Sequence, residues 1–211
     1  MKLSVLNPSS VALPPLGLHG DSLLSAPRIV CDAVSVVSGK EVAKSCSAFK
    51  KINPNGVDLS PKEVKIIPRG YKIYLHGDER GFVAPSDSRA RKPKVRDPKE
   101  LVTPDKQGFY DFAKGNLYEL RFPRVTIPAD CTGLAFPRST VNRLGIIKLE
   151  SAVFDSGYSG EPTQTIFTPL DARVHKDEAM IQLVFIRNEA PADELYHGRY
   201  QNEASTAHAR A

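Results

Sequence analysis

The chain has 211 residues and a mass of 23.1 kDa, which is enough for one substantial domain and too little for two large ones. Lys and Arg number 29 against 24 Asp and Glu, so the net charge is only +5 and unfolding of the whole chain by self-repulsion is excluded. No apolar run approaches the ~20 residues that span a bilayer, and 17 Pro with 14 Gly argue against a helical bundle.

The first 27 residues are expected to form an arm ahead of the folded domain. Three prolines and a glycine interrupt the apolar stretch between residues 3 and 18, so the uninterrupted core of ~7–15 residues that a secretory signal needs is missing. The three cysteines, at positions 31, 46 and 131, form no CxxC pair, so neither a zinc site nor a disulfide framework is indicated. A reducing compartment, the cytoplasm, is therefore the expected location.

Residues 28–50 can hold a short helix between Ala33 and Phe49, although Val34–Val37 also suits a strand. From Ile52 onward, short apolar runs alternate with turn signals, a pattern typical of a β sandwich, a jelly roll or a closed barrel. The domain is therefore expected to span residues 28–187, followed by a mobile, polar tail over 188–211. The runs that indicate strands are 64–67, 71–75, 117–122, 133–136, 146–154, 164–168 and 180–186.

Residues 83–108 show little apolar periodicity and many charges, so they are expected to form an excursion loop. This segment holds the densest basic run, which is set among Ser, Pro and Asp: Arg89, Arg91, Lys92, Lys94 and Arg96. Because nucleic-acid binders concentrate such residues on one face or stripe, we interpret the run as a solvated loop and expect no nucleic-acid partner. Contact of this loop with an anionic partner is the alternative.

Residues 137–145, PRSTVNRLG, combine two guanidinium groups with two hydroxyls. Arg138 and Arg143 bracket Ser139 and Thr140 directly after a proline, and this set of donors suits the oxygens of a polyphosphate. The alternative is an ordinary helix start, in which Ser139 or Thr140 caps a short helix that ends at Gly145. The two interpretations are compatible, because the start of a helix also binds anions.

Three further residues could carry chemistry. Asp155 follows an apolar strand, where its carboxylate could accept a proton from water or simply cap a turn. Tyr158 could offer a flat face to a sugar ring or be a surface aromatic. Gln182 interrupts an apolar strand, so its amide must find partners in the core or in a ligand.

Four segments, in this order and spacing, resemble the dUTPase and dCTP deaminase superfamily, and most of all its archaeal dUTPases. They are NPNGVDL at 53–59, PRSTVNRLG at 137–145, AVFDSGYSG at 152–160 and IQLVF at 181–185. The resemblance covers residues 55–185, with a weaker echo at 196–201. It implies a mostly β subunit of the distorted jelly-roll or β-clip type, with a short helix near the N-terminus and another after the PRS motif. It also implies a homotrimer with sites at subunit boundaries, a pyrimidine deoxynucleoside triphosphate substrate and Mg²⁺.

The resemblance implies a role for each matching position. Asp155 matches the aspartate that activates water, and Asp58 matches the aspartate near the metal and its waters. Tyr158 matches the aromatic beneath the deoxyribose, while the hairpin backbone around Ala152 would select uracil. The residues implied to contact the phosphates are Arg138, Ser139, Thr140, Arg143, Gln182 and, on a closing C-terminal segment, Arg199.

Position 165 separates the two chemistries of this superfamily. The deaminases that the chain resembles carry a glutamate about ten residues after the aspartate that Asp155 matches. Here that position is Thr165, no Glu occurs between 162 and 170, and Glu161 comes too early. Hydrolysis of dUTP to dUMP and pyrophosphate is therefore expected. A membrane partner is not expected. The alternatives are a dCTP deaminase or bifunctional enzyme, and a non-catalytic nucleotide-binding regulator.

Overall fold

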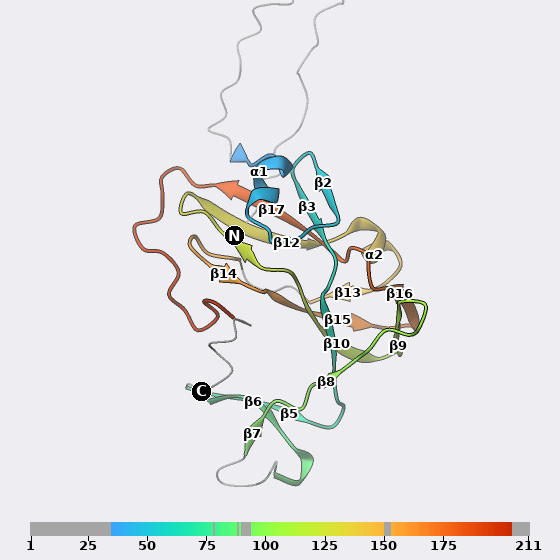
Figure 1. The fold of residues 1–211 in the computed structure, drawn as a ribbon. Coiled ribbons are helices and arrows are strands. Elements are labelled where there is room, and N and C mark those ends of the chain that lie inside the picture. The colour runs from blue at the N-terminus through green and yellow to red at the C-terminus, as the bar shows by residue number, and fades with distance from the viewer. Residues whose placement is uncertain (1–34, 78, 88, 90–93, 150–152, 204–211) are drawn as a thin grey trace, which may run out of the picture. The chain divides into compact units, whose positions relative to one another are not determined.

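The computed structural model describes residues 35–203 except 78, 88, 90–93 and 150–152 (Figure 1). The predicted arm over 1–27, the end of the predicted tail and Ala152 therefore lie outside the described residues. The described part is mostly β, as the sequence predicts, with short strands and two short α-helices. Within it, no helix is long and apolar enough to cross a membrane.

One five-stranded sheet is built around β17 (Ile181–Arg187). Along one edge β17 pairs with the full length of β12 (Cys131–Pro137), and along the other it pairs with β3 and β1. All of these pairings are antiparallel, and β2 extends the sheet beyond β3. The remaining strands of this sheet are β1 (Ser35–Val36), β2 (Lys51–Asn53) and β3 (Gly56–Leu59). Apolar residues alternate along β17, which buries Ile181, Leu183 and Phe185 in the core.

The second five-stranded sheet has β10 (Asn116–Arg121) at its centre. Its order is β13 (Ile147–Lys148), β15 (Thr163–Thr168), β10, β4 (Glu63–Ile67) and β8 (Glu100–Leu101). Alternation along β10 buries Tyr118 and Leu120, whereas Glu119 and Arg121 face away from the core. One hydrophobic cluster joins both sheets, and each fully buried large side chain in it contributes about 1.5–3 kcal/mol.

Three smaller sheets complete the domain. Pairs form between β9 (Phe109–Phe112) and β16 (Ala172–His175), and between β11 (Val125–Thr126) and β14 (Ser159–Gly160). A three-stranded sheet contains β5 (Lys72–His76), β6 (Glu79–Val83) and β7 (Val95–Arg96). The excursion predicted over 83–108 therefore includes β7, β8 and the 3₁₀ turn Pro85–Asp87. Strands of two residues are too short to show apolar periodicity, which is why the sequence predicts only a loop there.

The two helices lie close to where the sequence predicts them. The first, α1 (Gly39–Lys44), is shorter than the predicted span and follows strand β1. A Cβ on Gly39 would lie 1.8 Å from the carbonyl oxygen of Asn53, so only glycine permits this approach of α1 to β2. The second helix, α2 (Ser139–Arg143), begins after Arg138, which is the N-cap but makes no side-chain capping bond. The capping role predicted for Ser139 or Thr140 is therefore wrong, since the N-cap lies one residue before the first and two before the second. Both residues are exposed.

Candidate active site

Three of the predicted site residues gather near the end of β12, around β17 and its other neighbour β3. The Nε of Arg138 lies 3.0 Å from Oδ2 of Asp58, and its Nη1 donates to Glu178 at 2.9 Å. Asp58 is buried, and Nδ2 of Asn53 donates to its Oδ1 at 2.6 Å across the tight β2–β3 hairpin. Gln182 is the cross-strand neighbour of Asp58 on β17. The motif NPNGVDL therefore builds a hairpin that fixes the direction of the Arg138 guanidinium.

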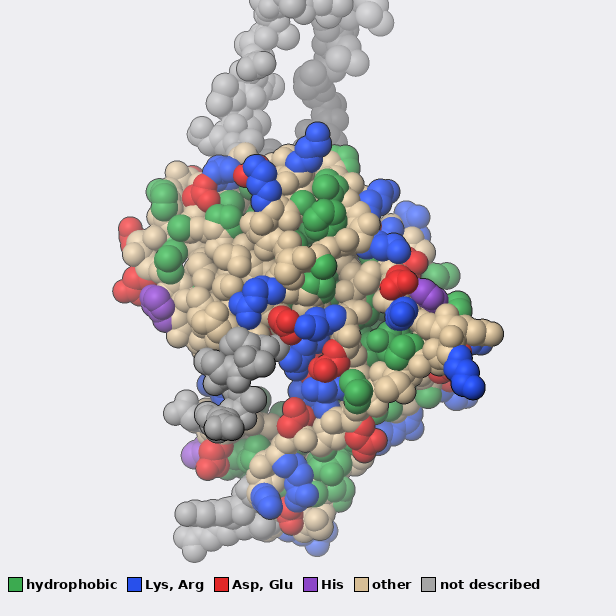
Figure 2. All heavy atoms as spheres, viewed as in Figure 1, with side chains coloured by type: hydrophobic (Ala, Val, Ile, Leu, Met, Phe, Trp, Pro, Cys, Tyr) green, Lys and Arg blue, Asp and Glu red, His purple; other side chains and the backbone are tan. Residues whose placement is uncertain are grey.

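The polar side chains that follow Arg138 are open to solvent. Ser139, Thr140 and Arg143 are exposed on α2, and none has a side-chain partner among the described residues. The Arg143 guanidinium and the two hydroxyls can therefore donate hydrogen bonds to an anion without first breaking contacts to other described side chains, whereas Arg138 is already paired with Asp58 and Glu178. On the face seen in Figure 2, by contrast, Lys and Arg are interspersed with Asp and Glu, so that face carries no single-sign basic stripe.

Asp155 and Tyr158 line a different feature, a pocket of about 520 Å³. The other residues that line it come from the segment before β8, from β10, from the loop before β14, from β15 and from the C-terminal segment: Lys99, Glu119, Val153, Phe154, Thr163, Gln164, Tyr196, Tyr200 and Glu203. Arg138, Ser139 and Arg143 do not line this pocket. Within one chain, the structure therefore separates the predicted water-activating residue from the predicted phosphate-binding residues.

Asp155 opens a tight turn that its own side chain does not hold. The amide of Tyr158 donates to the Asp155 carbonyl at 3.1 Å, and Gly157 has a φ of +83°, which favours glycine. The buried hydroxyl of Ser156 donates to the Cys131 carbonyl at 2.7 Å and accepts from Asn188 at 3.1 Å. The Asp155 carboxylate is exposed and has no partner in the described part of the chain. This geometry contradicts the turn-capping interpretation and leaves the carboxylate available as a proton acceptor.

Tyr158 is buried, which contradicts the interpretation as a surface aromatic. Its ring stacks on Phe154 at a centroid distance of 5.4 Å and meets Tyr196 edge-on at 5.8 Å. Its hydroxyl donates to Glu203 at 2.5 Å. Burial, and then this hydrogen bond, raise the pKa of Tyr158, and burial also raises the pKa of the Glu203 carboxyl. A Cβ on residue 160 would lie 2.7 Å from the Tyr158 hydroxyl, so Gly160 makes room for this pair.

The C-terminal segment over 196–203 runs along the turn that carries Asp155. The amide of Tyr196 donates to the Ser156 carbonyl at 2.8 Å, and that of Asn202 donates to the Ser159 carbonyl at 2.7 Å. Gln201 accepts from the Ser159 amide and donates to the Gly157 carbonyl. Arg199 is exposed and does not line the pocket. The sequence predicts that this tail is mobile, and that stays a prediction. The weak resemblance at 196–201 is the sequence signal that coincides with the docked segment.

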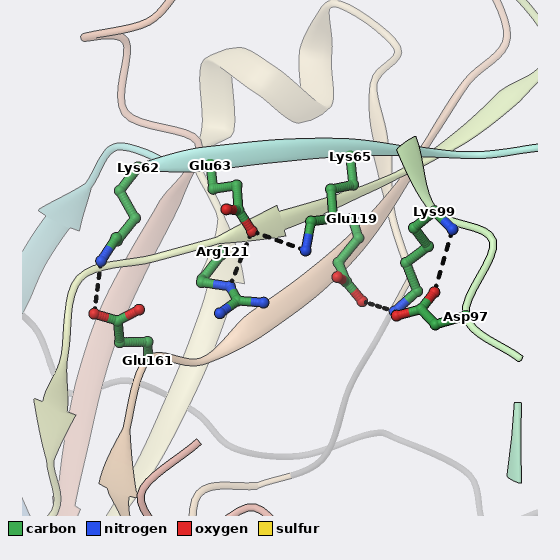
Figure 3. A network of polar contacts seen from close by, with 8 residues as sticks. All are labelled: Lys62, Glu63, Lys65, Asp97, Lys99, Glu119, Arg121 and Glu161. Atoms are coloured by element: carbon green, nitrogen blue, oxygen red, sulfur yellow. Dashed lines mark hydrogen bonds and ion pairs between the residues drawn. The ribbon is translucent and has the colours of Figure 1, made fainter. Parts of the chain in front are cut away.

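Lys99 and Glu119 are charged pocket residues to which the sequence assigns no role. Lys99 Nζ lies 2.6 Å from Glu119 Oε2, and their side chains are 17% and 14% exposed (Figure 3). Glu119 stands directly opposite Thr165 of β15, the position at which the resemblance predicts the glutamate of a deaminase. The structure thus puts a carboxylate beside position 165, although it comes from the neighbouring strand.

The described residues hold no group of three or more His, Cys, Asp or Glu arranged to bind a metal ion. Both oxygens of Asp58 are engaged, one by Asn53 and one by Arg138. This arrangement does not fit direct coordination of Mg²⁺ by Asp58.

Burial raises the pKa of Cys46 to about 12 and that of Cys131 to about 11, so neither thiol is a nucleophile at neutral pH.

Residues 32–188 match the model of a protein family described as dCTP deaminase-like. A protein of Methanosarcina mazei named probable deoxyuridine 5'-triphosphate nucleotidohydrolase is 33% identical over 156 residues, covering 72% of this chain and 82% of that protein. A protein of Persephonella marina named dCTP deaminase, dUMP-forming, is 27% identical over 154 residues, covering 70% of this chain and 83% of that protein. The crystal structure of the 2'-deoxycytidine 5'-triphosphate deaminase from Agrobacterium tumefaciens has a TM-score of 0.52 at 16% identity. That match covers 74% of this chain and 47% of that chain, and it bears on the fold alone.

Proposed function

The chain belongs to the dCTP deaminase-like family, and from this membership we propose that it hydrolyses dUTP to dUMP and pyrophosphate. The observation that carries the proposal is the Asp155 carboxylate, which has no partner among the described residues and lies at a pocket that Tyr158 also lines. The similarity to proteins named as probable dUTP hydrolases supports it, as does Thr165 at the position of the deaminase glutamate.

In the proposed reaction, Asp155 accepts a proton from water while the water oxygen forms a bond to the α-phosphorus. The bond from that phosphorus to the bridging oxygen breaks, and pyrophosphate leaves with the electron pair. Arg138, Ser139 and Arg143 bind the negative charge that grows on the leaving group. Tyr158 lies beneath the deoxyribose, and Asp58 orients Arg138 through the ion pair at 3.0 Å.

The reaction as proposed requires a second copy of the chain. Arg138 and Ser139 do not line the pocket of Asp155, so one chain offers only half of the required groups. Closed cyclic assembly brings one subunit's arginines to the next subunit's pocket. We therefore propose the homotrimer that the resemblance implies, with each site shared between two subunits.

Mg²⁺ enters the proposal as part of the substrate. Triphosphate oxygens are hard ligands that Mg²⁺ prefers, and it usually keeps several waters when bound. Because Asp58 is already paired with Arg138, we assign it no direct bond to the ion. Gln182, which lies opposite Asp58 on β17, is the residue that we propose to contact the phosphates beside Arg138. When bound, the ion would neutralise charge on the pyrophosphate.

Incubation of the full-length protein with dUTP or dCTP in Mg²⁺, followed by separation of the products, tests the proposal. The expected result is dUMP and pyrophosphate from dUTP, with dCTP unchanged. Glu119 beside Thr165 gives the deaminase alternative a specific basis, and release of ammonia from dCTP would establish it. Nucleotide binding without turnover of either substrate would instead identify a non-catalytic regulator.

A further inference from the structure

We propose that Glu119 and Lys99 read the base of the nucleotide, with the Glu119 carboxylate accepting the N3–H of uracil. This inference rests on the proposed function and adds a specificity-determining side chain to it. The carboxylate and the ammonium line the same pocket as Asp155 and Tyr158. They approach it from two segments far apart in the sequence, β10 and the residues just before β8.

The position of Glu119 is rigid. It lies on the central strand of its sheet, with Thr165 opposite on one side and Lys65 opposite on the other. In Figure 3, Lys99 points from the edge of the sheet to the Glu119 carboxylate. Lys99 contacts Oε2, and Oε1 has no partner among the described residues. A carboxylate oxygen with free acceptor capacity is therefore held in a fixed place at the pocket wall.

The charges around the pocket suit the base and not the phosphates. The network in Figure 3 contains four acidic and four basic side chains, so its cations are balanced: Lys62, Glu63, Lys65, Asp97, Lys99, Glu119, Arg121 and Glu161. The pocket itself is lined by the carboxyl groups of Glu119, Asp155 and Glu203, with Lys99 as the cation. Such a lining repels the β- and γ-phosphates, which carry most of the negative charge, and accepts the uncharged end of the nucleotide.

An acceptor and a donor 2.6 Å apart match one edge of uracil. Its N3–H can donate to Glu119 while the adjacent carbonyl oxygen accepts from Lys99. Cytosine presents an unprotonated N3 at the same place, and that lone pair would face the carboxylate. A site built around the N3–H therefore rejects cytosine, because the mismatch leaves buried polar groups unpaired. Glu119 and Lys99 thereby favour uracil through their side chains, in addition to the selection expected from the hairpin backbone around Ala152.

The test compares two identical substitutions, Glu119→Gln and Glu161→Gln, in the full-length protein. The control is closely matched: Glu161 is 17% exposed, forms an ion pair of 2.6 Å with Lys62, and does not line the pocket. Calorimetry gives the dissociation constants for dUMP and dCMP, and thermal unfolding confirms that each variant folds. Lys99→Met is a second variant, which removes the donor and the ion-pair partner of Glu119 but keeps the Glu119 side chain itself.

Glu119→Gln is expected to weaken dUMP binding about 10- to 100-fold, as loss of a hydrogen bond to a charged group does. It should also narrow the preference for dUMP over dCMP, because the amide can donate to N3 of cytosine. Lys99→Met should weaken dUMP binding as well, and Glu161→Gln should change it by no more than about twofold. Equal effects of the two Gln variants, an unchanged preference, or wild type that binds no dUMP would overturn the inference. If wild type binds dUMP selectively but leaves dUTP intact, the proposed function fails while base reading stands.

Discussion

Asp155→Asn should remove most of the turnover of dUTP and leave the fold intact. The Asp155 carboxylate is exposed and has no partner among the described residues, so the free energy of unfolding should change by no more than about 0.5 kcal/mol. A general base contributes ~10²–10⁴ in rate, which equals about 2.7–5.4 kcal/mol of transition-state stabilisation. The expected loss of transition-state stabilisation is therefore several times larger than any loss of folding stability.

Ser156, the residue after Asp155, supplies a control in which stability is expected to fall while turnover is kept. The buried Ser156 hydroxyl donates to the Cys131 carbonyl at 2.7 Å and accepts from Asn188. Ser156→Ala leaves these groups unpaired, which costs about 1–3 kcal/mol. That loss lowers the melting temperature by about 2–12 °C for a domain of this size. Below its melting temperature this variant should keep most of its turnover.

The assay follows pyrophosphate release at saturating dUTP, with thermal unfolding of the same samples and binding of a non-hydrolysable dUTP analogue. Asp155→Asn should still bind the analogue, because Arg138 and Ser139 carry the phosphate contacts. Near-normal turnover of this variant would remove Asp155 from the mechanism. A variant that melts as early as Ser156→Ala would make Asp155 a structural residue and refute the reasoning.

Light scattering should give a mass near three times 23.1 kDa, and a monomer at micromolar concentration would contradict the shared site. Because burial raises the pKa of Glu203, the docked C-terminal segment binds a proton more tightly than the free segment does. Docking should therefore weaken as pH rises from the ordinary pKa of a glutamate through the raised one, and Glu203→Gln should abolish this dependence. Hydrogen exchange of the Asn202 amide, followed as a function of pH, measures this docking. Equal profiles for the wild type and the Glu203→Gln variant would count against this role of Glu203. Thr165→Glu should confer traces of dCTP deamination, detected as released ammonia, and lower the melting temperature, because it sets a second carboxylate directly opposite Glu119.

Local patterns predict the features that short stretches of sequence determine. The mostly β architecture, helix α2 after Pro137 and the turn that carries Asp155 all follow from apolar runs and turn residues within about ten positions. The direct contact of Asp58 with Arg138 is not predicted, because the two residues meet only through pairing of β3 and β12 with β17. The same holds for Lys99 and Glu119, since Lys99 lies in a segment without periodicity. Contacts set by strand pairing leave no signature near either residue.

Strand β17 imposes an order on biosynthesis. It is the last described strand in the chain, yet β1, β3 and β12 all pair with it, and Ser35 near the start lies opposite Arg187. A chain still on the ribosome therefore has three strands waiting with unpaired edges until residues 181–187 emerge. Since translation adds about 5–20 residues per second, these edges stay open for seconds and can pair wrongly with other nascent chains. We therefore expect wrong strand pairing to be most frequent during synthesis, before residues 181–187 are available to pair with β1, β3 and β12.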